Sequence, residues 1–393
     1  METFDVVIVG SGLVGATLAC ALGKDCRVAV IDQKMSPPAE SSLTSETKAM
    51  ALSWPSVICL KNLGVWPLIE SVFFPIFRVH VSKQKRFGNV DLRALEIALP
   101  FLGGVIDANS LNKALVDVAK TLKKVQFFQP DVIQFQERKK EGWDLYLQSQ
   151  KRLFAPLLVA ADGAHSMLCK TQGIHHVEKN HRQVAIVAAV TVESEQPGTA
   201  FEHFLENGAI ALLPFGQKML KSVWVMEQNR YESLKDLPDT DYLAQLQANV
   251  GYRAGRFHRV FPRSVYPLQS RVAESLYQDR FVVIGNAANQ LHPIAAQGFN
   301  LGLRDAAFLA EKMIEAQKTG IDSGSLELLR SYAKTREKDH EQTRQFLGML
   351  TEFNKAQEWG ILGSTIPAVK RWIMKQSLGE RVTLPKLCRG IVK

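Results

Sequence analysis

The sequence FDVVIVGSGLVGATLACALGKDCRVAVID, residues 4–32, decides the fold. It begins with a continuous apolar run, FDVVIV, of the kind that parallel sheets bury on both faces. GSGLVG follows at once at residues 10–15, and residues 16–23 predict a helix. RVAVI at 27–31 predicts a second strand, which ends in Asp32. A strand, a glycine loop, a helix and a strand ending in an acid, in this order, predict a dinucleotide-binding βαβ unit rather than a chance glycine loop.

Each glycine of this loop has a physical role. Gly10 permits the tight turn, Gly12 lets the backbone approach a pyrophosphate, and Gly15 lets the helix pack on the strand. Asp32 stands where a carboxylate can accept hydrogen bonds from an adenosine ribose. These four residues are therefore candidate cofactor-binding positions.

Two later strands also end in turns suited to ligands. LLVAA at 157–161 ends in Asp162-Gly163, which predicts a second ligand-binding turn at the edge of a sheet, although Asp162 could equally cap the next helix. The stretch FVVIGNAANQLHPIAAQGFNLGLRD, residues 281–305, predicts a buried strand, a turn-like segment and a helix from Gly298 onward. Its loop leads to a helix N-terminus, where free backbone N–H groups can hold a polar ligand.

Length and composition favour an ordinary globular protein. With 393 residues, 46% of them hydrophobic and 22% charged, the chain should form about two to three domains. No apolar run approaches the ~18 residues of a membrane span, and the N-terminus lacks a secretory signal. The five cysteines form no C-x-x-C pair, so we expect neither a disulfide framework nor a metal site. A reduced, cytoplasmic setting fits best.

The net charge of +9 raises the question of nucleic acid. The basic residues are spread along the chain, and no basic run is interleaved with aromatic residues. We therefore expect no nucleic-acid partner. A diffuse surface field, an anionic membrane surface or phosphorylated cofactors explain the charge better.

The segments between the motifs predict further elements. Residues 48–63 predict one helix, and 73–99 predict strands and turns. A helix follows from Ser110, with Asn109 as its N-cap, and residues 125–150 predict a meander of strands.

The second half changes character at residue 183. Residues 183–265 predict a mostly antiparallel insertion that contains a helix at 239–250. A long helix is expected from Leu326 to about Gln357. Its solvated face should consist of Arg336, Lys338, Asp339, Glu341 and Arg344. The last thirty residues or so predict a basic amphipathic helix, which we expect to pack on the first domain.

The three motifs GSGLVG, AADGAHS and GNAANQLHPIAAQGFNLGLRD occur in a fixed order. Together they resemble those of the class A flavoprotein aromatic hydroxylases, which have the p-hydroxybenzoate hydroxylase fold. Within that group the chain is most similar to the ubiquinone-biosynthesis hydroxylases, and in particular to the 2-octaprenyl-6-methoxyphenol hydroxylases. The resemblance implies an α/β fold with a Rossmann-type FAD domain, an inserted, mostly antiparallel β substrate domain and a C-terminal helical region.

This resemblance divides the chain into three parts. Residues 1–72, 100–182 and 266–345 would form the FAD domain, 73–99 and 183–265 the substrate domain, and 346–393 the helical region. It also implies a set of cofactor-binding residues: Gly10, Gly12, Leu13, Val14, Gly15, Asp32, Lys48, Asn109, Asp162, Gly163, Gly285, Asn286, Pro293, Gln297, Gly298, Phe299 and Asn300.

Several of these positions depart from the wider family. Asp32 replaces a Glu, and Lys48 and Asn109 stand where Arg is common. Two further departures are Cys169 for an Arg and Ala296 for a Gly. Asn286 replaces the Asp that holds a ribityl hydroxyl; an amide can still bond a hydroxyl, but it carries no charge.

The chemistry implied by the resemblance is aromatic hydroxylation. NAD(P)H would be a transient electron donor, O2 a co-substrate and a C4a-hydroperoxyflavin the oxygen-transferring species. His292 and Pro293 would line the flavin–substrate face. His292 could steer the phenol proton, or it could be a structural residue beside a turn.

The expected substrate is a hydrophobic prenylated phenol, whose tail suits the apolar strands of the inserted domain. Such a substrate makes association with a multiprotein quinone-biosynthesis complex, or with the surface of the inner membrane, an expectation. Two alternatives remain: a flavin-dependent reductase or dehydrogenase of the same fold, and a non-catalytic FAD-binding subunit of a complex.

Overall fold

The computed structural model describes residues 1–35, 49–85, 88–292, 297–355, 367–379 and 383–390. Its centre is a six-stranded sheet in the order β20-β21-β13-β2-β3-β9, in which only β20 is antiparallel. The bounds of these strands are Tyr277–Gln278 for β20, Phe281–Val283 for β21, Leu158–Ala160 for β13, Val6–Val9 for β2, Val28–Ile31 for β3 and Val125–Phe128 for β9. Apolar, β-branched strands of this kind form a sheet that is buried on both faces.

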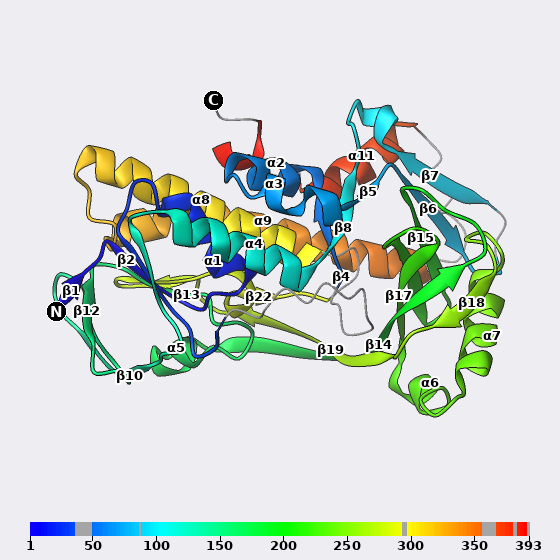
Figure 1. Cartoon of the computed structure of the whole chain (residues 1–393), viewed down its shortest axis with the longest axis horizontal. Coiled ribbons are helices and arrows are strands. Elements are labelled where there is room, and N and C mark those ends of the chain that lie inside the picture. Colours follow the sequence, from blue (N-terminus) through cyan, green and yellow to red (C-terminus); the bar gives the residue numbers. More distant parts are fainter. Residues whose placement is uncertain (36–48, 86–87, 293–296, 356–366, 380–382, 391–393) are drawn as a thin grey trace.

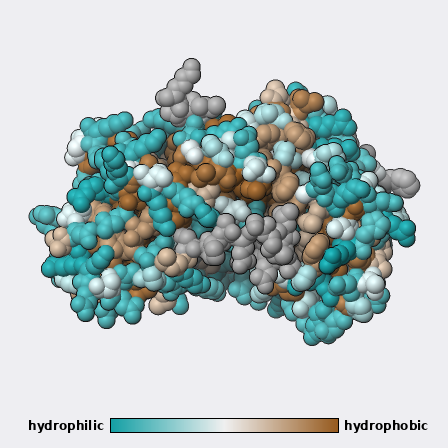
Figure 2. Space-filling view, viewed as in Figure 1, coloured by the Kyte–Doolittle hydropathy of each residue, from teal (hydrophilic) through white to brown (hydrophobic). Residues whose placement is uncertain are grey.

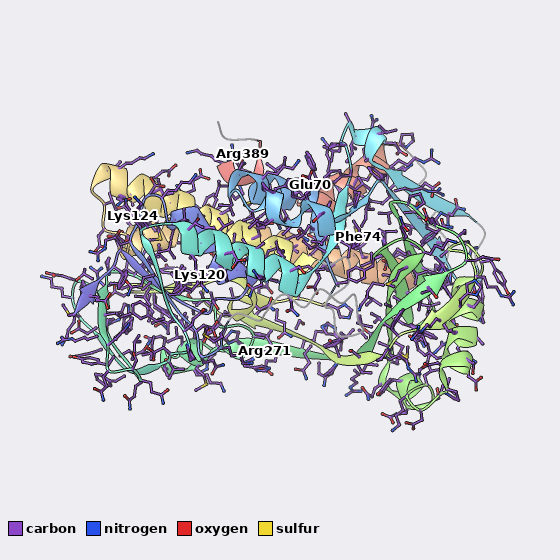
Figure 3. All side chains as sticks on the ribbon, in the orientation of Figure 1. Glu70, Phe74, Lys120, Lys124, Arg271 and Arg389 are labelled. Atoms are coloured by element: carbon purple, nitrogen blue, oxygen red, sulfur yellow. The ribbon has the colours of Figure 1, made fainter. Side chains whose placement is uncertain are left out.

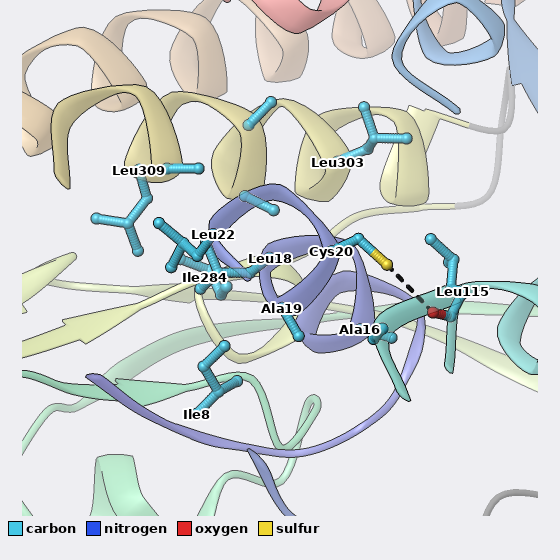
Figure 4. Close-up of a cluster of buried hydrophobic side chains, with 14 of the residues drawn as sticks. Ile8, Ala16, Leu18, Ala19, Cys20, Leu22, Leu115, Ile284, Leu303 and Leu309 are labelled. Atoms are coloured by element: carbon cyan, nitrogen blue, oxygen red, sulfur yellow. Dashed lines mark hydrogen bonds between the residues drawn. The ribbon is translucent and has the colours of Figure 1, made fainter. Parts of the chain in front are cut away.

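Helices cover one face of this sheet (Figure 1). They are α1 (Leu13–Leu22), α2 (Trp54–Asn62), α4 (Ala108–Thr121), α8 (Gln297–Thr319) and α9 (Leu326–Lys355). Figure 4 shows the resulting core, where Ile8 of β2 and Ile284 after β21 meet Leu18, Leu22 and Leu309 of the helices. The alternation of side chains along β2 explains how one strand serves both faces.

A four-stranded sheet, β1-β12-β11-β10, covers the opposite face. Its strands are β1 (Glu2–Thr3), β10 (Ile133–Arg138), β11 (Trp143–Leu147) and β12 (Arg152–Ala155), and α5 (Met167–Thr171) follows β13. The expected meander at 125–150 is therefore only partly right. Its first strand, β9, belongs to the parallel sheet because it pairs with β3.

A nine-stranded sheet forms the other half of the molecule (Figure 1). Its main path is β22-β19-β14-β17-β16-β15-β6-β7, and β18 also pairs with β14. The bounds are Asn289–Gln290 for β22, Ser264–Ala273 for β19, His176–Val192 for β14, Met219–Glu227 for β17, Gly208–Pro214 for β16, Thr199–Leu205 for β15, Arg78–Lys83 for β6, Asn89–Arg93 for β7 and Phe257–Val260 for β18. Helices α6 (Gln228–Glu232) and α7 (Asp239–Val250) pack beside it, and the latter has the bounds that its sequence predicted.

A small sheet, β4-β8-β5, joins the two halves. It consists of β4 (Ala49–Ser53), β8 (Gly103–Asp107) and β5 (Phe74–Ile76). The single helix expected at 48–63 is thus wrong, because residues 49–53 pair with β8 and the helix begins only at Trp54, with Pro55 in its first turn. Short elements complete this region: α3 (Trp66–Ile69), η1 (Glu70–Val72) and η2 (Ala94–Ile97).

Helices α4 and α9 each differ from the sequence prediction at one point. The N-cap of α4 is Asp107, whose carboxylate accepts from the backbone N–H of Ser110 at 2.8 Å, and Asn109 is exposed in the first helical turn. On α9, Lys338 and Glu341 are exposed as expected.

Arg336 and Asp339 of α9, by contrast, are fully buried. The expectation of a solvated face is wrong for these two residues, because each has an oppositely charged partner inside the protein.

The C-terminal segment contains α11 (Pro367–Leu378) and η5 (Lys386–Cys388). Met374 and Ile373 of α11 pack on Val90 and Leu92 of β7. We expected the last thirty residues or so to pack on the first domain. Most apolar partners of α11 come from residues 73–99, whereas Cys388 of η5 lies in the core beneath α2 and α8. No helix in the described ranges is both long enough and apolar enough to cross a membrane.

Candidate functional site

The carboxyl ends of β2, β3, β13 and β21 meet at one edge of the parallel sheet. Val9 is in register with Ile31 and with Ala160, and Ala160 is in register with Val283. The segments that directly follow these strands carry all three sequence motifs. Ligands of open α/β sheets bind at this type of edge, so the fold brings the motifs together where a ligand is expected.

The glycine loop after β2 is tightly packed at two positions and open at one. A Cβ on Gly10, whose φ is +106°, would lie 2.4 Å from the carbonyl oxygen of Ala161, and a Cβ on Gly15 would lie 1.9 Å from that of Gly10. At Gly12, the exposed N-cap of α1, a Cβ would meet nothing within 4 Å. The packed glycines shape the loop, and Gly12 leaves backbone N–H groups of a helix start open to a pyrophosphate.

Asp32 is tied to the same loop. Its Oδ2 accepts hydrogen bonds from the backbone N–H of Ser11 at 2.6 Å and from the Ser11 hydroxyl at 2.8 Å, and its Oδ1 accepts from the N–H of Lys34 at 2.9 Å. A carboxylate has about four acceptor positions, so one remains for a ribose hydroxyl. Asp32 therefore fixes the loop and can still contact a nucleotide.

The Asp-Gly turn after β13 serves the next helix. Oδ2 of Asp162 accepts from the N–H of Met167 at 3.0 Å, which is the capping role that we considered. Its Oδ1 is buried and has no partner among the described residues. Burial raises the pKa of Asp162. Beside it, Gly163 has a φ of +89°, and a Cβ there would meet nothing within 4 Å.

Arg271 of β19 contacts this turn, and the sequence did not predict it as a site residue (Figure 3). Its guanidinium donates to the carbonyl of Ala164, lies 2.8 Å from Nδ1 of His165 and forms an ion pair with Glu178 at 2.9 Å. It thus holds the Asp-Gly turn against the nine-stranded sheet. No local sequence signal marks it, because the contact depends on how β19 crosses the turn.

The late motif places its polar residues in different surroundings. Asn286 is exposed, next to Gly285 at the end of β21, whereas Asn289 is 2% exposed. A Cβ on Gly298, in the first turn of α8, would meet nothing within 4 Å. Phe299 is partly buried and packs against the core between the helices and the parallel sheet.

Asn300 has a structural role that the sequence did not reveal. Its Oδ1 accepts from the backbone N–H of Ser53 at 2.9 Å and from the hydroxyl of Ser56 at 2.7 Å, and its Nδ2 donates to the carbonyl of Ala51 at 3.0 Å. The amide therefore joins β4 and α2 to the start of α8. Gln297 similarly donates to the carbonyl of Ser377 in α11 at 2.8 Å.

A buried ion network lies behind this loop, between α8 and α9. Asp305 binds Arg336 at 2.7 Å and His340 at 2.8 Å, and Arg304 binds Asp339 at 2.7 Å. Burial alone would raise the pKa of Asp305, but the charges of His340 and Arg336 outweigh it and lower the pKa to about 2. The network keeps the carboxylate charged while it contacts the loop.

His292 packs against His181 of β14, with 4.8 Å between ring centroids, and its Nε2 lies 3.3 Å from Oε1 of Gln183. Burial and the neighbouring His181 lower its pKa to about 4, so the ring is neutral near pH 7. The expectations at Lys48, Pro293 and Ala296 lie outside the described residues.

The sequence matches the family described as "FAD binding domain" over residues 3–346. The chain belongs to this family. It is 32% identical to the ubiquinone hydroxylase UbiL of Rhodospirillum rubrum, over 86% of this chain and 78% of that protein. It is 28% identical to the 3-demethoxyubiquinol 3-hydroxylase of Escherichia coli, over 86% of each chain. The resemblance to ubiquinone-biosynthesis hydroxylases is confirmed.

A solved structure agrees with the expected fold. The p-nitrophenol 4-monooxygenase PnpA from Pseudomonas putida DLL-E4 has a TM-score of 0.77 and 19% identity, covering 97% of this chain and all of that chain. The α/β, p-hydroxybenzoate hydroxylase-like fold is therefore confirmed. The family and its named hydroxylases identify the chain as an FAD-dependent monooxygenase of the aromatic hydroxylase type.

Proposed function

We propose that this FAD-dependent monooxygenase hydroxylates the ring of a polyprenylated phenol in ubiquinone biosynthesis, with NAD(P)H as electron donor and O2 as co-substrate. The observation that carries the proposal is the convergence of the three motifs at one sheet edge, with open backbone at Gly12, Gly163 and Gly298. The similarity to ubiquinone hydroxylases supports the choice of substrate.

The residues at this edge fit FAD. Backbone N–H groups after Gly12 would bind the pyrophosphate, Asp32 a ribose hydroxyl and Asn286 the ribityl chain. The bound FAD would supply electron transfer from NAD(P)H to O2 and delivery of one oxygen atom to the ring. The protein would provide position, charge and exclusion of water.

The start of α8 provides positive potential. This 23-residue helix begins at Gln297, so the positive end of its dipole lies at this loop. Because the Asn300 side chain is committed to β4 and α2, we assign the binding of an anionic ring system to the backbone around Gly298. Such oriented donors stabilise developing negative charge without reorganising.

Apolar surroundings favour a hydrophobic substrate. Ile76, Val105 and Phe215 are buried where the small sheet meets the nine-stranded sheet. Apolar side chains also gather in the middle of the face shown in Figure 2, between the two halves of the molecule. A phenol with a prenyl tail that binds at this apolar surface would remove its own apolar surface from water, which is favourable.

Purified protein, a short-chain prenylated phenol, NAD(P)H and labelled O2 test the proposal. We expect a flavin absorbance band and a product that gains one labelled oxygen atom. Oxidation or reduction of the substrate without this gain would favour the reductase alternative. A Gly12→Asp variant that folds, joins its complex and still supports quinone production without FAD would favour the non-catalytic subunit.

A peripheral membrane contact is a second proposal, carried by α11. Lys370 of this helix bonds Glu96 of η2 at 2.5 Å, and both segments carry exposed apolar side chains, Trp372 at 46% and Leu95 at 86%. Exposed aromatic and aliphatic side chains beside lysines are typical of proteins that bind at a bilayer interface.

A further inference from the structure

Lys221 is a buried lysine in the middle of the nine-stranded sheet. It lies on β17 between β14 and β16, it is 0% exposed, and its Nζ has no hydrogen-bond or ion-pair partner within the described ranges. The other lysine or arginine side chains described as buried are Arg271, Arg304 and Arg336, and each has a carboxylate partner. A buried cation without a partner destabilises a protein unless something compensates for it.

The direction of the lysine follows from the alternation along β17. Leu220 and Trp224 lie in the core that includes α7, so Lys221 lies on the opposite face. On that face its Nζ is 5.6 Å from the ring centroid of Phe215. Phe215 in turn contacts Phe74 of the small sheet, with 5.5 Å between ring centroids. Phe74 lies between the two halves of the molecule in Figure 3.

The charge of Asp107 acts on Lys221. Burial lowers the pKa of Lys221, and the charge of Asp107 offsets this effect only in part. Oδ2 of Asp107 caps α4 through the N–H and hydroxyl of Ser110, while its Oδ1 is buried without a partner among the described residues. No direct bond between the two groups is described, so the Lys221 amine and Oδ1 of Asp107 both remain without a hydrogen-bond partner among the described residues.

This pair lies next to the strand that meets the start of α8. Asp107 is in register with Ala49 of β4, and two residues further along β4 the carbonyl of Ala51 accepts from Asn300 of α8. The same small sheet therefore connects the Lys221 face to the helix start that is expected to bind the flavin ring. A ring substrate between the flavin and the nine-stranded sheet would contact this face.

We propose that Lys221 binds the phenol oxygen of the ring substrate and takes up its proton. The proposal rests on the function proposed above. In the step, the phenol O–H bond breaks, an N–H bond forms on Nζ, and an ammonium–phenolate pair results without any change in oxidation state. A desolvated amine is suited to accept this proton, and the anion then compensates the buried ammonium. The ionised ring is richer in electrons, which favours transfer of an electrophilic oxygen.

The test measures the ionisation of a bound phenol by its ultraviolet difference spectrum. The probe is 2-(3-methylbut-2-enyl)phenol, added to the FAD-loaded enzyme over a pH series below the probe's own pKa of about 10. We compare the wild type, Lys221→Met, and Lys218→Met, which replaces an exposed lysine near the start of β17. The wild type and Lys218→Met should bind the probe as phenolate.

Lys221→Met should bind the probe as the neutral phenol, with Kd raised about tenfold to a hundredfold. Its melting temperature should equal or exceed that of the wild type, because the variant removes a buried polar group that has no hydrogen-bond partner among the described residues. A phenolate spectrum in Lys221→Met, or a neutral phenol in the wild type, overturns the proposal. If Lys221→Met does not fold, Lys221→Gln is measured; failure of both to fold assigns the lysine a purely structural role and also overturns it.

The two proposals fail in different ways. A wild type that hydroxylates the probe but binds it as the neutral phenol contradicts only the role of Lys221. A wild type that is loaded with FAD and neither binds nor oxidises the probe contradicts the proposed function itself.

Discussion

Oδ2 of Asp305 accepts a hydrogen bond from the backbone N–H of Gly285 at 3.2 Å. This bond connects the loop after β21 to the buried ion network between α8 and α9, because Oδ1 of the same carboxylate binds Arg336 and His340. Gly285 has a φ of +63°, and a Cβ there would lie 2.9 Å from a methyl group of Val14 in α1. The network thus positions a loop that has no room to move toward α1.

The Asp305→Asn variant tests this link. It leaves Arg336 and His340 beside a neutral side chain, and breaking a buried pair in this way destabilises a protein by about 3–5 kcal/mol. We expect a large fall in melting temperature and weaker FAD retention. Glu341→Gln on α9 is the matched control, because Glu341 is exposed and its pair with Arg344 contributes little. Equal stability of the two variants would show that the network is not important for the fold.

The pH dependence of Asp305 has a defined sign. Its folded pKa of about 2 lies below the usual value of 3.8, so the stability that it contributes is present above about pH 4. This contribution is lost as the pH falls from about 4 through 2. Denaturant titrations in that range should show a steeper loss for the wild type than for Asp305→Asn.

A second pH effect comes from His203. Burial, with a smaller contribution from the charge of Arg253, lowers its pKa from 6.5 to about 4. The unfolded chain therefore binds more protons between these values, and stability falls as the pH drops from 6.5 to 4, by at most about 1.4 kcal/mol per pH unit for one group. His203→Gln should reduce this slope, measured by chemical unfolding, while His292, whose pKa is also lowered to about 4, keeps its own contribution. The exposed His258→Gln should leave it unchanged, and the same slope in both variants would rule out His203 as its source.

The glycine loop gives a prediction that separates folding from cofactor binding. Gly10→Ala would place a methyl group against the Ala161 carbonyl at a positive φ, so we expect destabilisation of about 1–3 kcal/mol or more. Gly12→Ala has open space and a φ of −64°, so the apoprotein should melt like the wild type. Its FAD affinity should nevertheless fall about tenfold or more, equivalent to about 1.4 kcal/mol. Calorimetry and flavin titration measure the two effects, and normal FAD binding by Gly12→Ala would remove the loop from the cofactor site.

The sequence predicted what local pattern determines. The glycine spacing at residues 10–15 and the apolar run at 281–284 are signals within one element, and so is the amphipathic helix at 239–250. Arg336 and Asp339 were misjudged because charged residues on a helix normally face water, and only the packing of α9 on α8 reveals their partners. Residues 49–53 were predicted as helix but form strand β4, because the strand is short and is fixed by its pairing with the distant strand β8. Lys221 was missed for a similar reason, since the sequence of β17 does not indicate which residues of other elements surround its side chain.

The contact of α11 with a membrane surface gives the last prediction. Trp372 is 46% exposed although its neighbours Ile373 and Met374 pack on β7, so replacing it should not disturb the core. Trp372→Glu removes an interfacial anchor and adds a negative charge near Lys370, and both changes weaken attraction to anionic lipid. We expect the affinity for vesicles of phosphatidylglycerol and phosphatidylethanolamine, measured by sedimentation, to fall about tenfold, which corresponds to about 1.4 kcal/mol of binding free energy.

Leu326→Glu is the control, because Leu326 is 45% exposed at the start of α9, after the turn where Ser323 contacts Asp5. Equal loss in both variants would indicate a nonspecific effect of charge, and no loss in Trp372→Glu would exclude α11 as the membrane contact.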